Sequence, residues 1–201
     1  MKFRSALLCL LLSAHAYAAN TVNPQNQALV SVEYSSDGVQ TGCGLRATGD
    51  TPEGLKLNIL VTVFRKDTGA TFGVIKVVAR QFRMKNGAIA MEDGVPVVEN
   101  LGRIENAWIR PDSGQQPKID MSAMSSHNDA FMVNTEFSGT VDLLVAMARQ
   151  KFSVGINRND GNPDQVFRFD ARLSSAESAK FSVCMDNLRA VMEESKHQGT
   201  F

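Results

Sequence analysis

Along most of the chain, apolar and polar residues alternate with the two-residue period that is typical of half-buried β-strands. The alternation is cleanest at Leu55, Leu57, Ile59, Val61 and Val63, which should share one buried face. The predicted strands span 28–34, 39–47, 55–65, 71–82, 88–91, 95–98, 104–109, 130–137, 152–156 and 165–173. Many short strands of this kind predict a mainly β domain, either an antiparallel sandwich or a barrel.

Tight turns are predicted where Asp-Gly or Asn-Gly pairs separate the strands. Asp37-Gly38, Asn86-Gly87 and Asp93-Gly94 fit the two-residue hairpin turn, in which both central residues adopt a positive φ. The segment 66–69 is predicted to be a further hairpin turn, so the strands on either side of it should pair. These turns favour strands that are neighbours both in sequence and in space.

Two segments change to the spacing of an amphipathic helix. A short helix is predicted over 139–150, with the apolar residues Val141, Leu144, Val145 and Ala148. A longer closing helix is predicted over 174–196, where Ser174 and Glu177 fit a capping box. Its apolar stripe consists of Phe181, Cys184, Met185, Leu188, Val191 and Met192. The fold is therefore predicted to be a β domain closed by a C-terminal helix, with an α+β arrangement as the alternative.

Strand-like alternation is lost between Arg110 and Asn128, where prolines, glycine, serines and amides show little periodicity. We predict a long loop here and expect it to hold the contact surface, because loops on rigid scaffolds commonly carry binding sites. The segment 19–27 is also polar and rich in amides, which predicts a flexible leader. The remaining residues, 28–201, are interpreted as a single domain.

The N-terminal residues have the composition of a Sec-type signal peptide. A basic start with Lys2 and Arg4 is followed by an apolar run over 6–12 and by Ala16-Tyr17-Ala18. Cleavage near Ala18 would deliver the protein to the periplasm or to the exterior of the cell. The apolar run is shorter than the roughly 20 residues of a transmembrane helix, and no second candidate follows. We therefore expect an exported protein without a membrane span.

The balance of charge narrows the class of partner. The sequence holds 21 basic and 21 acidic residues, so loss of Lys2 and Arg4 with the signal peptide leaves a net charge of −2. A strongly basic surface that would attract nucleic acid or an anionic membrane is therefore not expected. The predicted partner is instead a protein or another component of the cell envelope.

The cysteines predict one disulfide. Removal of Cys9 with the signal peptide leaves Cys43 and Cys184, an even number in a compartment where disulfides persist. Gly42 and Gly44 flank Cys43, which would let the closing helix approach the strand at this point. A bond that encloses roughly 140 residues should stabilise the fold by about 5 kcal/mol in the chain-entropy model.

Three soft potential metal ligands, Met121, Met124 and His127, lie in the predicted loop. Thioether sulfur and imidazole nitrogen suit Cu(I), so one alternative function is that of a periplasmic copper-binding protein. Methionine and histidine are also ordinary residues for anchoring a loop. Apart from copper in this alternative, we predict no cofactor.

Other residues with binding chemistry on or beside the predicted loop are Trp108, Arg110, Asp120, His127 and Asp129. A hydrolase of envelope or carbohydrate substrates is a further alternative. However, the sequence contains no G-x-S-x-G elbow, and only His127 and His197 follow the signal peptide. We therefore favour an exported, non-enzymatic β domain that binds a partner protein or an envelope ligand, and we assign no catalytic residues.

Overall fold

The computed structural model describes residues 21–66, 68–112, 119–161 and 164–198. At 119–124, 191 and 194–198 it describes the backbone alone. The described residues form fifteen strands and two helices. The strands are β1 (Thr21–Val22), β2 (Gln25–Ser36), β3 (Val39–Asp50), β4 (Leu55–Arg65), β5 (Thr71–Phe82), β6 (Met84–Lys85), β7 (Ala88–Ile89), β8 (Met91–Glu92), β9 (Val95–Pro96), β10 (Val98–Glu99), β11 (Ile104–Pro111), β12 (Ile119–Ser126), β13 (Ala130–Thr135), β14 (Phe152–Arg158) and β15 (Gln165–Phe169). The helices are α1 (Phe137–Arg149) and α2 (Ser175–Gln198). The predicted signal peptide, 1–18, lies outside the described residues.

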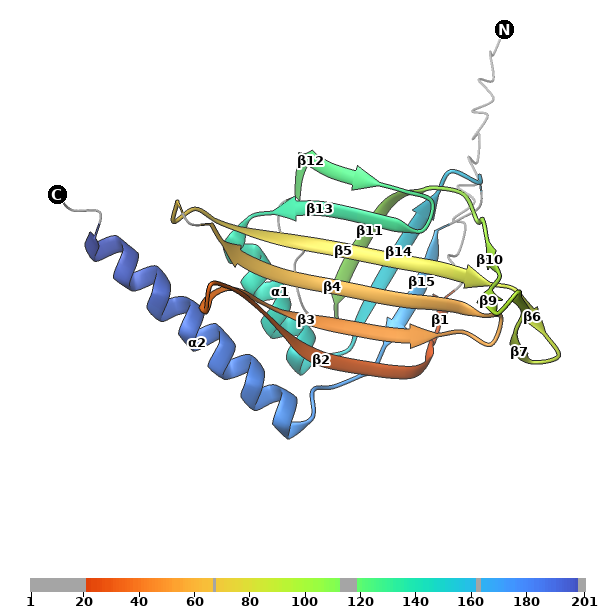
Figure 1. Cartoon of the computed structure of the whole chain (residues 1–201), viewed down its shortest axis with the longest axis horizontal. Coiled ribbons are helices and arrows are strands. Elements are labelled where there is room, and N and C mark those ends of the chain that lie inside the picture. The colour runs from red at the N-terminus through yellow and green to blue at the C-terminus, as the bar shows by residue number, and fades with distance from the viewer. Residues whose placement is uncertain (1–20, 67, 113–118, 162–163, 199–201) are drawn as a thin grey trace, which may run out of the picture.

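The larger of the two main sheets is antiparallel and has the strand order β12-β13-β5-β4-β3-β2 (Figure 1). Strands β2 to β5 form a meander, in which each strand pairs with the next one along the chain. Asp37 and Gly38 both have positive φ, at 52° and 77°, and the same holds for Asn86-Gly87 and Asp93-Gly94. The predicted tight turns are therefore confirmed, as is the pairing of 55–65 with 71–82.

One face of the large sheet is buried beneath α1 and the second sheet. Every second residue of β4, from Leu55 to Val63, is at most 5% exposed. Helix α1 packs against β3, β4 and β5, and Gly73 on β5 permits this contact because a Cβ there would overlap Thr140 on the helix. The Oγ1 atoms of Thr140 and Thr135 are 2.6 Å apart, so a hydrogen bond links the first turn of α1 to the end of β13.

The second sheet has the order β1-β15-β14-β11 and lies behind the large sheet in Figure 1. Its inward side chains complete the core; among them, the rings of Phe152 and Phe169 stack with centroids 5.1 Å apart. In the described chain, the edge strands of the large sheet do not pair with the small sheet, so no closed barrel forms. The predicted fold class is confirmed, in its open, sandwich-like form with two helices.

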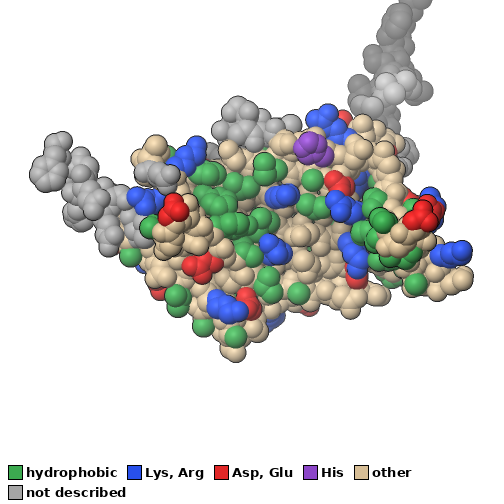
Figure 2. All heavy atoms as spheres, viewed as in Figure 1, with side chains coloured by type: hydrophobic (Ala, Val, Ile, Leu, Met, Phe, Trp, Pro, Cys, Tyr) green, Lys and Arg blue, Asp and Glu red, His purple; other side chains and the backbone are tan. Residues whose placement is uncertain are grey.

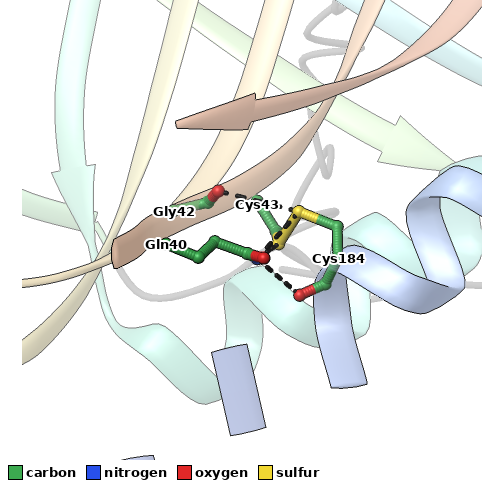
Figure 3. Close-up of a disulfide and its surroundings, with 4 residues drawn as sticks. All are labelled: Gln40, Gly42, Cys43 and Cys184. Atoms are coloured by element: carbon green, nitrogen blue, oxygen red, sulfur yellow. Dashed lines mark hydrogen bonds between the residues drawn. A yellow bond between two sulfur atoms is a disulfide. The ribbon is translucent and has the colours of Figure 1, made fainter. Parts of the chain in front are cut away.

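Helix α2 closes the side of the domain beside β2 and β3. Phe181, Cys184 and Leu188 are buried, as predicted for the apolar stripe, and Glu177 N donates to Ser174 Oγ at 3.2 Å. The predicted disulfide joins Cys184 to Cys43, with Cα atoms 5.9 Å apart (Figure 3). Within the residues that the structure describes, neither helix combines the length and the apolar content that crossing a membrane requires.

The described part of the predicted flexible leader is ordered into strands. β1 covers Thr21–Val22 and pairs with β15, while β2 already begins at Gln25. The hydrogen bonds of Gln27 explain why a polar segment can form strands here. Its Oε1 accepts hydrogen bonds from the backbone N–H groups of Asp170 and Ala171, so a side-chain amide takes the place of a neighbouring strand.

The predicted long loop between Arg110 and Asn128 is wrong in part. Strand β11 continues to Pro111, and β12 occupies Ile119–Ser126. The register of β12 against β13 shifts between Asp120 and Ser125. A bulge of this kind interrupts the two-residue alternation, which is why the pattern alone did not predict the strand. Residues 113–118 lie outside the described part.

Candidate functional site

The outward face of the large sheet, called the open face below, is formed by side chains of β2, β3, β4, β5 and β13. In Figure 1, no other element of the described chain lies in front of it. Strand register arranges its side chains in rows that cross the sheet. Each row therefore brings together residues from distant parts of the sequence.

The row nearest the β4–β5 turn is aromatic. Tyr34 lies opposite Gly42, and Phe64 lies between Gly42 and Phe72. The ring centroids of Tyr34 and Phe64 are 5.0 Å apart, and those of Phe64 and Phe72 are 5.6 Å apart. Gly42 makes room for this contact, because a Cβ at that position would lie 2.6 Å from Phe64 Cδ1. The three rings therefore form one band across β2 to β5.

The next two rows extend this band into a larger hydrophobic surface, which we call the apolar patch. Its residues are Val30, Val32, Tyr34, Leu60, Phe64, Phe72, Val74 and Met132. All of them are partly exposed, and Met132 reaches 39%. Figure 2 looks onto the open face and shows hydrophobic side chains gathered over β4, β5 and β13. Contiguous apolar surface of this kind is typical of an interaction site.

Two exposed cations, Arg46 and Lys76, lie within the last row of the apolar patch, between Leu60 and the outer residues Val30 and Met132. Both lie opposite Leu60, one on each side of it, in the third row. Among the described residues, no carboxylate forms an ion pair with either cation. Of the other cations beside this part of the sheet, Lys56 pairs with Asp50, Arg80 pairs with Asp129, and Lys66 Nζ lies 5.2 Å from the ring centroid of Phe72. The open face therefore combines apolar surface with two cations that no described carboxylate neutralises.

A shallow groove of about 590 Å³ occupies the opposite end of the open face. Its polar lining residues are Asn26, Thr48, Asp50, Lys56, Asn58 and Arg80. Asn26 has a φ of 47° and donates from Nδ2 to Asp50 Oδ1 at 3.0 Å, which fixes one wall of the groove. Hydrogen-bonding groups and the apolar patch thus share one continuous surface.

Beside the groove, a buried arginine holds the corner of the sheet together. Arg158 is 6% exposed and donates hydrogen bonds of 2.7–2.8 Å to three backbone carbonyl groups, those of Ala79, Gly102 and Asn128. Burial lowers the pKa of Arg158 below its usual value, whereas Asp160 and Asp129 act in the opposite direction. The guanidinium stays charged. Its bonds therefore fix the β12–β13 turn against β5.

The predicted binding residues whose side chains the structure describes lie in two places. Trp108 lies on the outer side of the small sheet against Gly155, with the Arg110 guanidinium 5.2 Å from its ring centroid. His127 and Asp129 belong to the turn between β12 and β13, where Asp129 accepts a hydrogen bond from Arg80 Nε at 2.7 Å. Asp120 lies in β12, and its side chain is outside the described part. Of the predicted set, Asp129 borders the open face through its ion pair with Arg80.

The predicted copper ligands Met121 and Met124 lie in β12, but their side chains are outside the described part of the chain. His127 is described, with its Nε2 atom 3.2 Å from Ser125 Oγ. Among the described residues, no three His, Cys, Asp or Glu side chains lie close enough together to hold a metal ion. The copper site therefore stays a prediction.

Sequence reasoning did not single out the open face, although its strands were predicted. The signal lies in β5, where Phe72 and Val74 alternate with the buried residues Ile75 and Val77. A strand with one solvated face normally carries polar residues on that face. Apolar residues on both faces of β4 and β5 therefore indicate a second apolar surface outside the core.

The chain matches no known family model, no curated protein and no solved structure. The chemistry of the open face therefore carries the functional argument.

Proposed function

We propose that this chain is an exported β domain that acts by binding a partner protein of the cell envelope through the open face. The observation that carries the proposal is the apolar patch, whose aromatic and aliphatic side chains remain partly exposed. Monomeric proteins rarely leave such a surface in water unless it serves an interaction. Tyr, Phe, Met and Arg, which are all present here, are also enriched in protein interfaces.

The position of the patch on a sheet supports a binding role. Strands β3, β4 and β5 each have a hydrogen-bonded neighbour on both sides, and their opposite face is packed in the core. Gly42 lets the Phe64 ring lie against the sheet, where Tyr34 and Phe72 hold it from both sides. Side chains that are already ordered lose little conformational freedom on association, which favours affinity.

Export is part of the proposal and is supported by two features. The first eighteen residues have the signal-peptide pattern. The Cys43–Cys184 disulfide fits an oxidising compartment, either the periplasm or the exterior of the cell. Sequencing of the N-terminus of the protein recovered from cells should find Ala19 as the first residue, and an intact Met1 would contradict export by this route.

Site-specific photo-crosslinking in intact cells tests the binding surface. A photoreactive residue at Val74, inside the apolar patch, should give a discrete, protease-sensitive adduct with a partner protein. The matched control is Val183, which is 59% exposed on α2 and outside the open face. Equal adducts at both positions, or none at Val74, would refute the role of the open face. An adduct at Val74 that resists protease would indicate a non-protein envelope ligand instead.

A further inference from the structure

The arrangement of charge on the open face indicates the shape of the bound segment. Arg46 on β3 and Lys76 on β5 both lie opposite Leu60 on β4, so they are two strands apart in one row. Neighbouring strands are about 4.8 Å apart, which separates the two backbones by roughly 10 Å. Along β4, Leu60 lies between the two cations and Phe64 lies in the aromatic row; Thr62 between them is buried, so Leu60 and Phe64 provide the accessible apolar contacts of this strand.

An α-helix with its side chains is about 10–12 Å wide, which matches the separation of the two cations. A helix laid along β4 would rest its apolar stripe on Leu60 and Phe64. Side chains at both borders of that stripe would then reach Arg46 on one side and Lys76 on the other. Carboxylates at these borders would neutralise two cations that no carboxylate of the described chain neutralises.

We propose that the open face binds an amphipathic helix of the partner whose apolar stripe is flanked by carboxylates on both sides. This inference rests on the proposed function and specifies the chemistry of the same site. Recognition of this kind places apolar anchors at helical spacing on a preformed surface and uses charge at the borders for specificity.

A second copy of this chain fits the open face poorly. A twofold axis at Leu60 would bring Arg46 and Lys76 of one copy against the same two cations of the other, and the described residues offer no free carboxylate there. A lipid surface fits poorly for a different reason. The rings of Tyr34, Phe64 and Phe72 pack against one another and are only partly exposed, whereas insertion into a bilayer needs protruding apolar side chains.

Two labelled peptides with the same leucine stripe test the inference by fluorescence anisotropy on the purified protein. Both are about 18 residues long, which is enough for a helix, and they carry either glutamate or lysine at the stripe borders. The acidic peptide should bind at least about tenfold more tightly than the basic one. The double variant Arg46→Glu with Lys76→Glu should reverse this preference. Phe72→Ser should weaken both peptides.

The matched control is Lys85→Glu with Arg189→Glu, which makes the same change in net charge at exposed positions outside the open face. It should keep the wild-type preference, and thermal melting should show that all variants are folded. Equal binding of both peptides, or binding of neither, would overturn the acidic helix; the Val74 crosslink then still decides separately whether the open face binds a partner. One further outcome would overturn the acidic helix in favour of a lipid surface. In that outcome the protein shows no peptide preference but sediments with phosphatidylglycerol vesicles, and the double variant Arg46→Glu with Lys76→Glu abolishes this sedimentation.

Discussion

The side-chain amide of Gln40 donates a hydrogen bond of 2.6 Å to the backbone carbonyl oxygen of Cys184, which lies 144 residues further along the chain. The same Nε2 atom lies 2.7 Å from Cys43 Sγ and 3.0 Å from Cys184 Sγ (Figure 3). Gln40 is only 8% exposed. One buried polar group therefore joins β3 to α2 at the disulfide, and its replacement should affect the attachment of the closing helix.

We expect Gln40→Glu to destabilise the protein by about 3 kcal/mol at pH 7, because an unpaired carboxylate would face the Cys184 carbonyl oxygen away from water. Burial raises the pKa of such a group in the folded state above its unfolded value of about 4.3. The loss should therefore be small below pH 4 and grow as the pH rises through the folded pKa. Urea unfolding at pH 7 and below pH 4 measures this loss of stability. Gln40→Leu, which removes the amide without adding a charge, should lack this pH dependence.

Removal of the disulfide should lower the free energy of unfolding by about 5 kcal/mol, because the unfolded chain loses a constraint that closes a very long loop. The variant is Cys43→Ala with Cys184→Ala, compared with the oxidised protein by urea unfolding. Wild-type protein with reduced cysteines is the control, since it keeps both side chains and lacks only the bond. An unchanged unfolding midpoint in both samples would show that the bond does not stabilise the fold.

Gly155→Ala should displace the only tryptophan of the chain. A Cβ at position 155 would overlap the indole ring of Trp108, which lies directly over the glycine. We expect a loss of about 2 kcal/mol and a shift of the fluorescence maximum as the ring turns towards water. Ser153→Ala on the same strand is the control. The additional substitution Trp108→Val should restore stability to the Gly155→Ala variant; without such a rescue, the overlap is not the cause.

The carboxylate of Glu177 should make the contribution of α2 to stability depend on pH. A hydrogen bond from Lys180 Nζ, at 2.7 Å, and one from the Ser31 backbone N–H, at 2.8 Å, lower the pKa of Glu177. A carboxylate with a lowered folded pKa stabilises the fold above its unfolded pKa, and this contribution disappears as the pH falls through the folded value. Melting of Glu177→Gln should therefore differ from wild type at pH 7 and converge with it in acid. Glu193→Gln, at an exposed position on the same helix, should follow the wild type at every pH.

Local features of the fold could be predicted from the sequence because each has a local cause. Two-residue alternation predicted β4 and β5, and Asp37-Gly38 predicted its turn because few other pairs tolerate two positive φ angles. Cys43 and Cys184 left a single possible pairing after the signal peptide. β12 escaped prediction because its register shifts, and β1 because its partner strand lies more than 140 residues away.

The candidate site was harder to predict than the fold. Tyr34, Phe64 and Phe72 belong to three strands, and only the register of those strands brings their rings together. Likewise, nothing local relates Arg46 to Lys76, which flank Leu60 after folding. Sequence reasoning instead gave weight to a segment rich in chemically versatile residues, where Asp129 alone is shown beside the open face through its partner Arg80.

The position of the two cysteines has a consequence for the order of events during export. Strands β2 to β5 pair with their neighbours in sequence, so the meander can assemble while the chain is still emerging. Cys43 belongs to this meander, whereas Cys184 lies in α2, so under the proposed export Cys184 would reach the oxidising compartment 141 residues later. If Cys9 leaves with the predicted signal peptide, the sequence offers Cys43 no intramolecular partner other than Cys184. An oxidised Cys43–Cys184 pair would then identify molecules in which α2 has joined the large sheet.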